Sequence, residues 1–194
     1  MLWTRFWSEH GLSAPEVAYA KGLGEDASLS IVQDALSHPK LRVVGFVVDM
    51  VDKIMHGMKL GTAGMHNQVR QWADGGFLAA LVDLMVGRGF EVYLTSDHGN
   101  VEATGIGRPA EGALSEIAGT RARVYADETL RSQVGQRFPD ALAWPPIGLP
   151  ENFLALLAPN RAAFTDVGKR LVGHGGITIE ELIVPYIHVE SRSL

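Results

Sequence analysis

The sequence contains no cysteine and no run of lysine and arginine. Without cysteine there is no disulfide, no thiolate nucleophile and no cysteine-bound zinc, and a reducing compartment is allowed. The lack of basic runs, together with a net charge of −5, argues against a surface for binding a nucleic-acid duplex. Nucleic acid is therefore not an expected partner.

Long apolar segments are lacking as well. The longest such run covers residues 43–48, is interrupted by Gly45 and is far too short to span a membrane. The first seven residues include aromatic side chains, but the chain turns polar at Ser8, which is not the pattern of a signal peptide. We expect a cytoplasmic protein with no membrane partner.

What is present is typical of one folded domain: 194 residues, of which 46% are hydrophobic and 20% charged. Residues 41–48 form a valine-rich run that predicts a strand buried on both faces. Apolar residues then recur at helical spacing over 67–86, where Gly75-Gly76 can divide the helix, and residues 90–94 predict a second strand. This alternation indicates an α/β layered domain.

The first 40 residues are expected to be an irregular and helical lead-in to a domain over 41–194. Ser30 and Gln33 have the spacing of a capping box, so a helix is expected to begin there and to end before Pro39.

Further along, residues 121–126 predict a short strand, and Asp127-Glu128 predicts the start of a helix. Residues 152–160 are expected to form a helical turn or a loop. A second capping box, Thr178 to Glu181, precedes a final strand over 182–189.

Asp52 and His56 are the first candidate metal ligands. They directly follow the valine-rich strand, and side chains four apart on a helical turn share one face. An isolated pair of this kind can equally be a solvated aspartate and a loop histidine. Asp49 also ends the strand and is a rival or an outer-shell group; Asp52 is preferred because only it has a histidine four residues later.

The second group is Asp97-His98, which ends the strand over 90–94 and precedes Gly99. A strand end can turn both side chains toward one cluster, although a capping aspartate and a rim histidine would fit the same pattern. His174 stands among three glycines, which give the backbone freedom to approach a ligand.

Together these residues are stronger evidence for a metal site than any one of them alone. All lie where a strand runs into a loop, which is where open α/β sheets place ligands. Carboxylate and imidazole without thiolate suit zinc or manganese. Two such ions, roughly 3.5–4 Å apart, clamp the attacking and leaving oxygens of an in-line phosphoryl displacement.

In this order the motifs resemble the alkaline phosphatase superfamily and, within it, the PglZ proteins of bacterial phage-defence systems. The resemblance rests on residues 47–57 and 173–185 with Asp97-His98-Gly99 between them, and it covers roughly residues 41–190. It implies an alkaline phosphatase-like three-layer sandwich with a mostly parallel central sheet, and a metal-dependent phosphatase or phosphodiesterase acting on phosphate esters.

The resemblance also implies a ligand set. Asp52, His56 and His174 would hold one divalent ion, zinc or manganese, and Asp97 and His98 would contribute to the second. The family's Ser or Thr nucleophile and another metal-binding Asp lie earlier, on a strand end and the turn after it. Ser13 and the stretch 28–30 are the only candidates here, and neither follows an apolar strand.

The chain is therefore expected to be the C-terminal part of an incomplete PglZ domain. It would carry metal ligands, lack the nucleophile and be inactive alone. Its partners would be a missing N-terminal half or other phage-defence proteins. The alternatives are a non-catalytic interaction module of a defence complex, or a relative of cofactor-independent phosphoglycerate mutase and phosphopentomutase.

Overall fold

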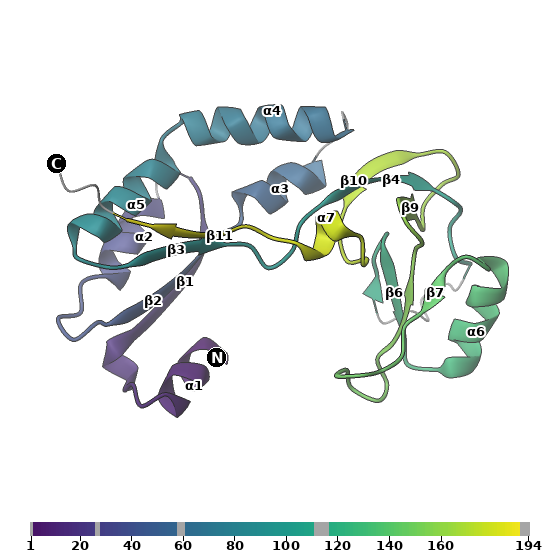
Figure 1. Ribbon diagram of the computed structural model, residues 1–194, viewed down its shortest axis with the longest axis horizontal. Helices are drawn as coiled ribbons and strands as arrows, with labels where there is room; N and C mark the ends of the chain where they lie inside the picture. Colours follow the sequence, from purple (N-terminus) through teal and green to yellow (C-terminus); the bar gives the residue numbers. More distant parts are fainter. Residues whose placement is uncertain (1, 26–27, 58–60, 111–116, 191–194) are drawn as a thin grey trace. The chain divides into compact units, whose positions relative to one another are not determined.

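The structure, a computed structural model, describes residues 2–25, 28–57, 61–110 and 117–190. The chain divides into two compact units. Unit 1 comprises Met1–Gly57, His66–Val92 and Val189–Leu194, and unit 2 comprises Met58–Met65 and Tyr93–His188. Both contain helices and small β-sheets, so the chain is a mixed α/β protein (Figure 1).

Unit 1 is built on two parallel strands, β1 (Val17–Leu23) and β2 (Val43–Val48). Helix α2 (Ser28–Ala35) follows β1 and contacts it. Helix α1 (Leu2–Glu9) also lies against β1, where the indole N–H of Trp3 donates a hydrogen bond of 3.0 Å to a backbone carbonyl oxygen of the strand (Figure 1).

The remaining helices of this part of the chain are η1 (Ala14–Glu16), α3 (Met50–Gly57), α4 (Gly61–Asp74) and α5 (Phe77–Gly87). The predicted break at Gly75-Gly76 is confirmed, since Gly76 adopts a φ of +85° between α4 and α5. No helix among the described residues is both long and apolar enough to cross a membrane.

Strand β1 was not predicted, so the description of the first 40 residues as irregular and helical was wrong in this respect. Its sequence signal is weak because Lys21-Gly22 interrupts the apolar residues. Gly22 has a φ of +75°, and the pairing with β2 is irregular between Ala20 and Leu23. Helix α2 begins at Ser28, two residues before the predicted start, and ends before Pro39 as predicted.

Unit 2 contains a four-stranded antiparallel sheet in the order β5-β6-β8-β7. The strands are β5 (Ile117–Ala118), β6 (Ala122–Tyr125), β8 (Leu154–Leu157) and β7 (Leu142–Ala143). The predicted strand over 121–126 is confirmed as β6. Helix α6 (Glu128–Arg137) contacts this sheet (Figure 1).

Successive residues of β6 and β8 point to opposite faces, so the sheet separates two apolar clusters. The larger cluster includes residues of α6 and consists of Tyr125, Val134, Leu156, Ala158 and Phe164. The smaller one consists of Val124, Ala155 and Leu157. As predicted, α6 starts at Asp127, whose carboxylate accepts a hydrogen bond of 2.8 Å from the Leu130 backbone N–H.

Strand β8 corrects the prediction of a helical turn or loop over 152–160. The run Leu154-Ala155-Leu156-Leu157 is too short and too uniformly apolar for its period to be seen in the sequence. Pairing with both β6 and β7 decides its conformation.

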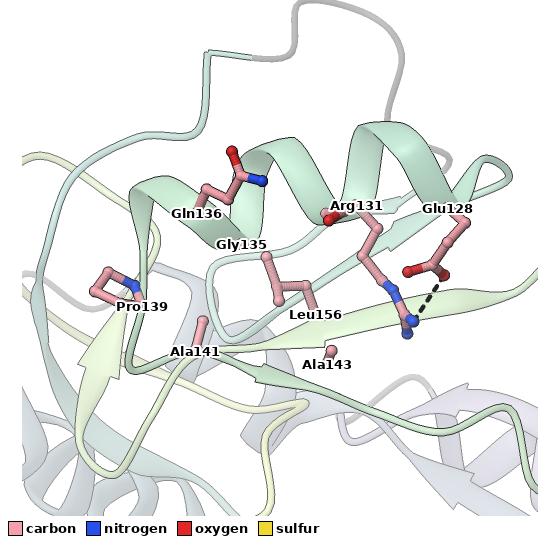
Figure 2. A pocket seen from close by; sticks show the side chains of 9 residues that line it. Glu128, Arg131, Gly135, Gln136, Pro139, Ala141, Ala143 and Leu156 are labelled. Carbon is pink, nitrogen blue, oxygen red and sulfur yellow. Dashed lines mark ion pairs between the residues drawn. The ribbon is translucent and has the colours of Figure 1, made fainter.

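A cavity of about 350 Å³ lies beside α6 (Figure 2). Arg131 pairs with Glu128 at 2.7 Å there and donates a hydrogen bond of 2.8 Å to the carbonyl oxygen of Trp144. The lining contains no histidine, so this cavity does not include the candidate metal ligands. The lining residues are Glu128, Arg131, Ser132, Gly135, Gln136, Pro139, Ala141, Ala143 and Leu156.

Two further sheets carry the candidate site. The first has the order β10-β4-β9, with β10 (Arg170–Gly173) antiparallel and β9 (Ala162–Ala163) parallel to β4 (Val101–Gly105). The second joins β11 (Tyr186–Val189) to β3 (Val92–Thr95). The predicted last strand begins later than residue 182 because residues up to Leu182 belong to a short helix, α7 (Ile179–Leu182).

The α/β class predicted from the sequence is thus confirmed. A single, mostly parallel central sheet is not what the described residues form. They form four small sheets, in which β1–β2 and β4–β9 pair in parallel, and β3 takes β11 as its partner. The strands are only two to seven residues long, which limits each ladder to a few residue pairs.

Candidate metal centre

His98 lies in the loop that leads from β3 to β4, and His174 directly follows β10. In the antiparallel ladder between β10 and β4, Gly173 is opposite Val101. Residues just after β10 and just before β4 therefore lie beside each other at one end of this ladder. Hydrogen bonding between strands, rather than closeness in sequence, brings the two histidines together.

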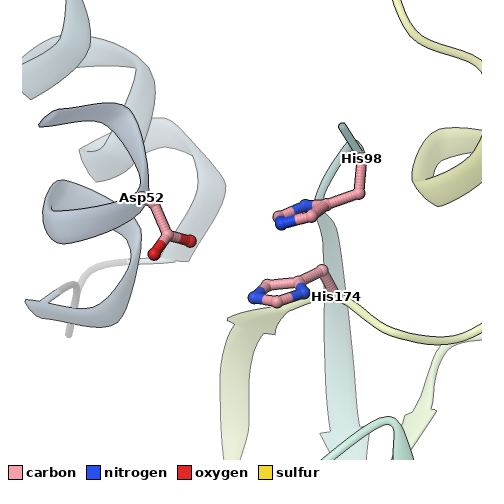
Figure 3. A group of neighbouring side chains, drawn as sticks. All are labelled: Asp52, His98 and His174. Atoms are coloured by element: carbon pink, nitrogen blue, oxygen red, sulfur yellow. The ribbon is translucent and has the colours of Figure 1, made fainter. Parts of the chain in front are cut away.

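The imidazole rings of His98 and His174 stack face to face (Figure 3). Their centroids are 3.8 Å apart, the angle between the ring planes is 12°, and each offers a ring nitrogen within 4.8 Å of one from the other. The stacking thus brings together two imidazoles, a side chain that commonly binds metals.

A hydrogen bond sets the orientation of His98. Its Nδ1 lies 3.1 Å from the carbonyl oxygen of Gly99. Because a carbonyl oxygen can only accept, Nδ1 is the donor in this bond, and in a neutral ring the lone pair is then on Nε2. A histidine that binds metal typically donates its other ring N–H in this way.

Asn100 is a further polar residue at this end of the ladder. It precedes β4 by one residue, as His174 follows β10 by one residue. Its side-chain oxygen is buried and has no hydrogen-bond partner among the described residues. A buried acceptor without a donor is costly unless something else satisfies it, and a cation or its bound water could do so. Imidazole nitrogens and an amide oxygen are ligands that suit zinc or manganese. His98, His174 and Asn100 of unit 2 thus fit a divalent ion of this kind.

Asp97 lies at the edge of this group. Its side chain is 90% exposed, and Oδ1 accepts a hydrogen bond of 3.1 Å from the backbone N–H of His98. The same oxygen is 3.8 Å from Nε2 of His98. The carboxylate is therefore close to the histidine and open to solvent.

In unit 1, Asp52 and His56 lie on α3, one helical turn apart (Figure 3 shows Asp52). Oδ2 of Asp52 is 3.4 Å from Nε2 of His56, so the expected sharing of one helix face is seen. Asp49, the rival candidate, precedes the helix and places Oδ1 3.2 Å from Nζ of Lys53. Its carboxylate is thus paired with the lysine ammonium group.

Unit 2 also contains a buried ion pair, Arg121–Glu181, that was not predicted from the sequence. Nε and Nη2 of Arg121 each lie 2.9 Å from one oxygen of Glu181, and both side chains are almost completely buried. Burial alone would raise the pKa of the Glu181 carboxyl. Hydrogen bonds from Arg121, Gly176 and Thr178 outweigh burial and lower the pKa to about 2. The capping box was the only sequence signal for Glu181, and nothing singled out Arg121.

Comparison with known proteins agrees with the motifs. The sequence profile of a family described as the BREX system PglZ alkaline phosphatase-like domain matches residues 1–189. The match extends the resemblance seen over 41–190 to include the first 40 residues. A search of curated proteins found no match. Since the family profile covers nearly the whole chain, this protein belongs to the PglZ family of alkaline phosphatase-like domains.

Proposed function

We propose that this chain supplies divalent-metal ligands to a PglZ domain that hydrolyses phosphate mono- or diesters. The observation that carries the proposal is the stacked pair His98 and His174 in a family described as alkaline phosphatase-like. Support comes from Asn100, at the same end of the β10–β4 ladder, whose side-chain oxygen is buried and has no hydrogen-bond partner among the described residues. Zinc and manganese are the ions that such donors suit.

The proposed ligand set follows the family resemblance. Asp52, His56 and His174 hold one ion, and Asp97 and His98 contribute to the other. The 3.4 Å separation of the Asp52 and His56 side chains is consistent with a shared ion. Bound ions would neutralise charge on the phosphoryl oxygens as the ester bond breaks. In this chain, the Gly99 carbonyl oxygen keeps the His98 proton on Nδ1 and leaves Nε2 free to bind.

Asp49 takes the outer position in this proposal. Its 3.2 Å contact with Lys53 keeps a cation next to the start of α3, one turn before His56. Asp49 and Lys53 are one helical turn apart, so their ion pair would stabilise the first turn of α3, which carries Asp52.

We propose that the Ser or Thr nucleophile lies outside this chain. Ser13 caps η1 and donates a hydrogen bond of 2.6 Å to Glu16, which commits it to a structural role. The expectation that no apolar strand precedes residues 28–30 is corrected by β1, which ends at Leu23, shortly before α2 begins at Ser28. Ser30, which is exposed, is therefore the serine to exclude by experiment.

The wider setting is part of the same proposal. The chain would act in phage defence, in the cytoplasm, with the rest of a PglZ domain or with other defence proteins as partners. In the complete domain, the parallel pair β1–β2 would belong to a larger central sheet covered by helices on both sides, as in a three-layer sandwich.

Metal binding tests the proposal directly. We expect the purified chain to bind zinc or manganese and to melt at a higher temperature when the metal is added. His98→Ala and His174→Ala should each weaken binding by about tenfold or more, because each removes a proposed ligand. Isothermal titration calorimetry of metal-free protein measures the affinity.

His38→Ala is the matched control, since this exposed histidine lies outside the proposed set and should leave the affinity unchanged. If the unmodified chain binds neither metal and its melting temperature does not rise, the metal proposal fails. The interaction-module alternative would then be favoured.

Hydrolysis tests where the nucleophile lies. We expect the metal-loaded chain alone to release no nitrophenol above background from p-nitrophenyl phosphate or bis-p-nitrophenyl phosphate, because the proposal places the nucleophile outside this chain. Turnover that disappears in Ser30→Ala would contradict this and would place the nucleophile within the chain.

A further inference from the structure

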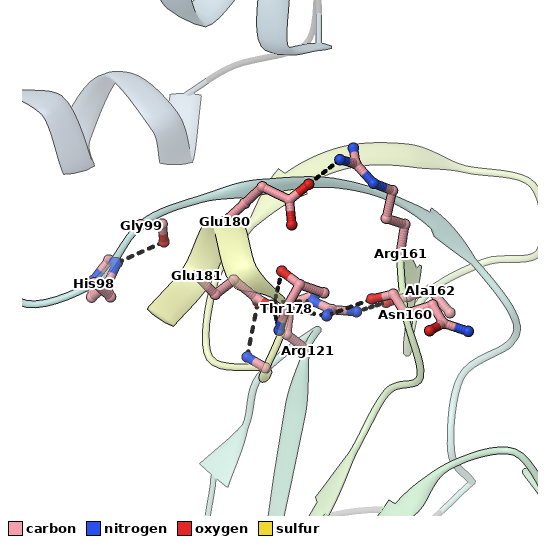
Figure 4. Close-up of polar contacts among 10 residues, drawn as sticks. His98, Gly99, Arg121, Asn160, Arg161, Ala162, Thr178, Glu180 and Glu181 are labelled. Carbon is pink, nitrogen blue, oxygen red and sulfur yellow. Dashed lines mark hydrogen bonds and ion pairs between the residues drawn. The ribbon is translucent and has the colours of Figure 1, made fainter. Parts of the chain in front are cut away.

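Helix α7 lies next to the loop that carries His98 and begins five residues after His174 (Figure 4). It is only four residues long, and its capping box fixes the direction of the Glu181 side chain. Oε2 of Glu181 accepts hydrogen bonds of 3.1 Å from the Thr178 backbone N–H and 2.8 Å from the Thr178 hydroxyl. The carboxylate is thereby folded back over the start of the helix.

The main chain of α7 holds the His98 loop. The backbone N–H of Gly99 donates a hydrogen bond of 2.9 Å to the carbonyl oxygen of Glu181. A Cβ atom on Gly99 would collide with the carbonyl oxygen of Glu180. The residue after His98 must therefore be glycine for the loop to reach the helix this closely.

The side chain of Glu181 holds the His174 loop. Its Oε1 accepts a hydrogen bond of 2.9 Å from the backbone N–H of Gly176, two residues after His174. A Cβ atom on Gly176 would lie 2.5 Å from Nη2 of Arg121 and 2.7 Å from Oε2 of Glu181. This loop is thus packed directly onto the ion pair.

Arg121 fixes Glu181 from the other side. Besides its two bonds to the carboxylate, it donates a hydrogen bond of 2.7 Å to the carbonyl oxygen of Asn160 and another to that of Ala162 (Figure 4). Because the guanidinium of Arg121 is planar and held by several acceptors, it fixes the position of the Glu181 carboxylate that it binds.

We infer that Glu181, held by Arg121, is a positioning residue for the His98–His174 pair. One residue binds the His98 loop through its carbonyl oxygen and the His174 loop through its carboxylate, so it sets how the two rings face each other. The inference rests on the proposed function only in that His98 and His174 are taken to bind metal. The positioning of the two rings by Glu181 does not depend on metal binding.

The test is Glu181→Gln, which keeps the size of the side chain and gives up the charge that Arg121 requires. We expect about a tenfold loss of zinc affinity, the range in which partners of metal ligands act. We also expect a changed visible spectrum of the cobalt-substituted protein and weaker nuclear Overhauser effects between the His98 and His174 ring protons. Thr178→Ala, which removes one bond to the carboxylate, should give a smaller change of the same kind.

Asp166→Asn is the matched control, because it removes a carboxylate from an exposed two-bond pair with Arg108 in the same unit. It should change none of the three measurements. If Glu181→Gln does not fold, as judged by circular dichroism, Thr178→Ala decides. Ring contacts and affinity that stay unchanged in the folded variants overturn the inference. Ring contacts that weaken in a chain that binds no metal support the positioning role while the proposed function fails.

Discussion

Arg121→Met should lower the free energy of unfolding by about 3–5 kcal/mol, the cost of removing one partner from a buried ion pair. The substitution leaves the carboxylate of Glu181 buried without its cation, and the carbonyl oxygens of Asn160 and Ala162 each lose a donor. Methionine fills much of the same space, so the loss would reflect charge and hydrogen bonding rather than a cavity. Urea unfolding followed by circular dichroism measures it.

The double variant Arg121→Met/Glu181→Leu separates these causes. Replacing both partners by apolar residues removes the unpaired charge, so its stability should be closer to that of the unmodified chain than to Arg121→Met. Arg108→Met, in the exposed pair with Asp166, should change stability far less, since water screens that pair. A stability of Arg121→Met within 1 kcal/mol of the unmodified chain would contradict the assigned role of the pair.

Local signals in the sequence predicted local features well. The spacing of Asp52 and His56 placed them on one helix face, and the capping box at Thr178 placed the start of α7. Each depends on residues at most four apart, so helix geometry alone is enough to derive it. The break at Gly75-Gly76 followed in the same way from the conformational freedom of glycine.

Features that depend on distant residues were missed. Arg121 and Glu181 are 60 positions apart, and no periodicity connects an arginine before one strand with a glutamate in a short helix. In strand β1 a glycine interrupts the apolar residues, and its pairing with β2 is irregular at that point. The strand is therefore defined by its pairing with β2 and not by its own sequence pattern. The stacking of His98 on His174 needed the register of β10 on β4, although both residues were selected individually.

Acid should unfold the chain partly through Glu181. Its pKa falls from an ordinary 4.5 to about 2 in the folded protein. A group with a lowered folded pKa contributes stability that is fully present above the unfolded pKa and is lost as the pH falls toward the folded one. The window is therefore pH 4.5 to 2, and the contribution at neutral pH is about 3 kcal/mol at most.

Urea unfolding at a series of pH values between 7 and 2, without metal, measures this contribution. Other carboxylates also have a lowered pKa, such as Asp166 with its hydrogen bonds from Arg108, so the informative quantity is a difference between variants. The stability gap between the unmodified chain and Glu181→Gln should be largest at neutral pH and should close below pH 4.5, because protonation of Glu181 removes the same charge as the substitution. The gap for Asp166→Asn should be much smaller at every pH, since that carboxylate is exposed. A gap for Glu181→Gln that stays constant down to pH 2 would mean that the carboxylate is not charged in the folded protein.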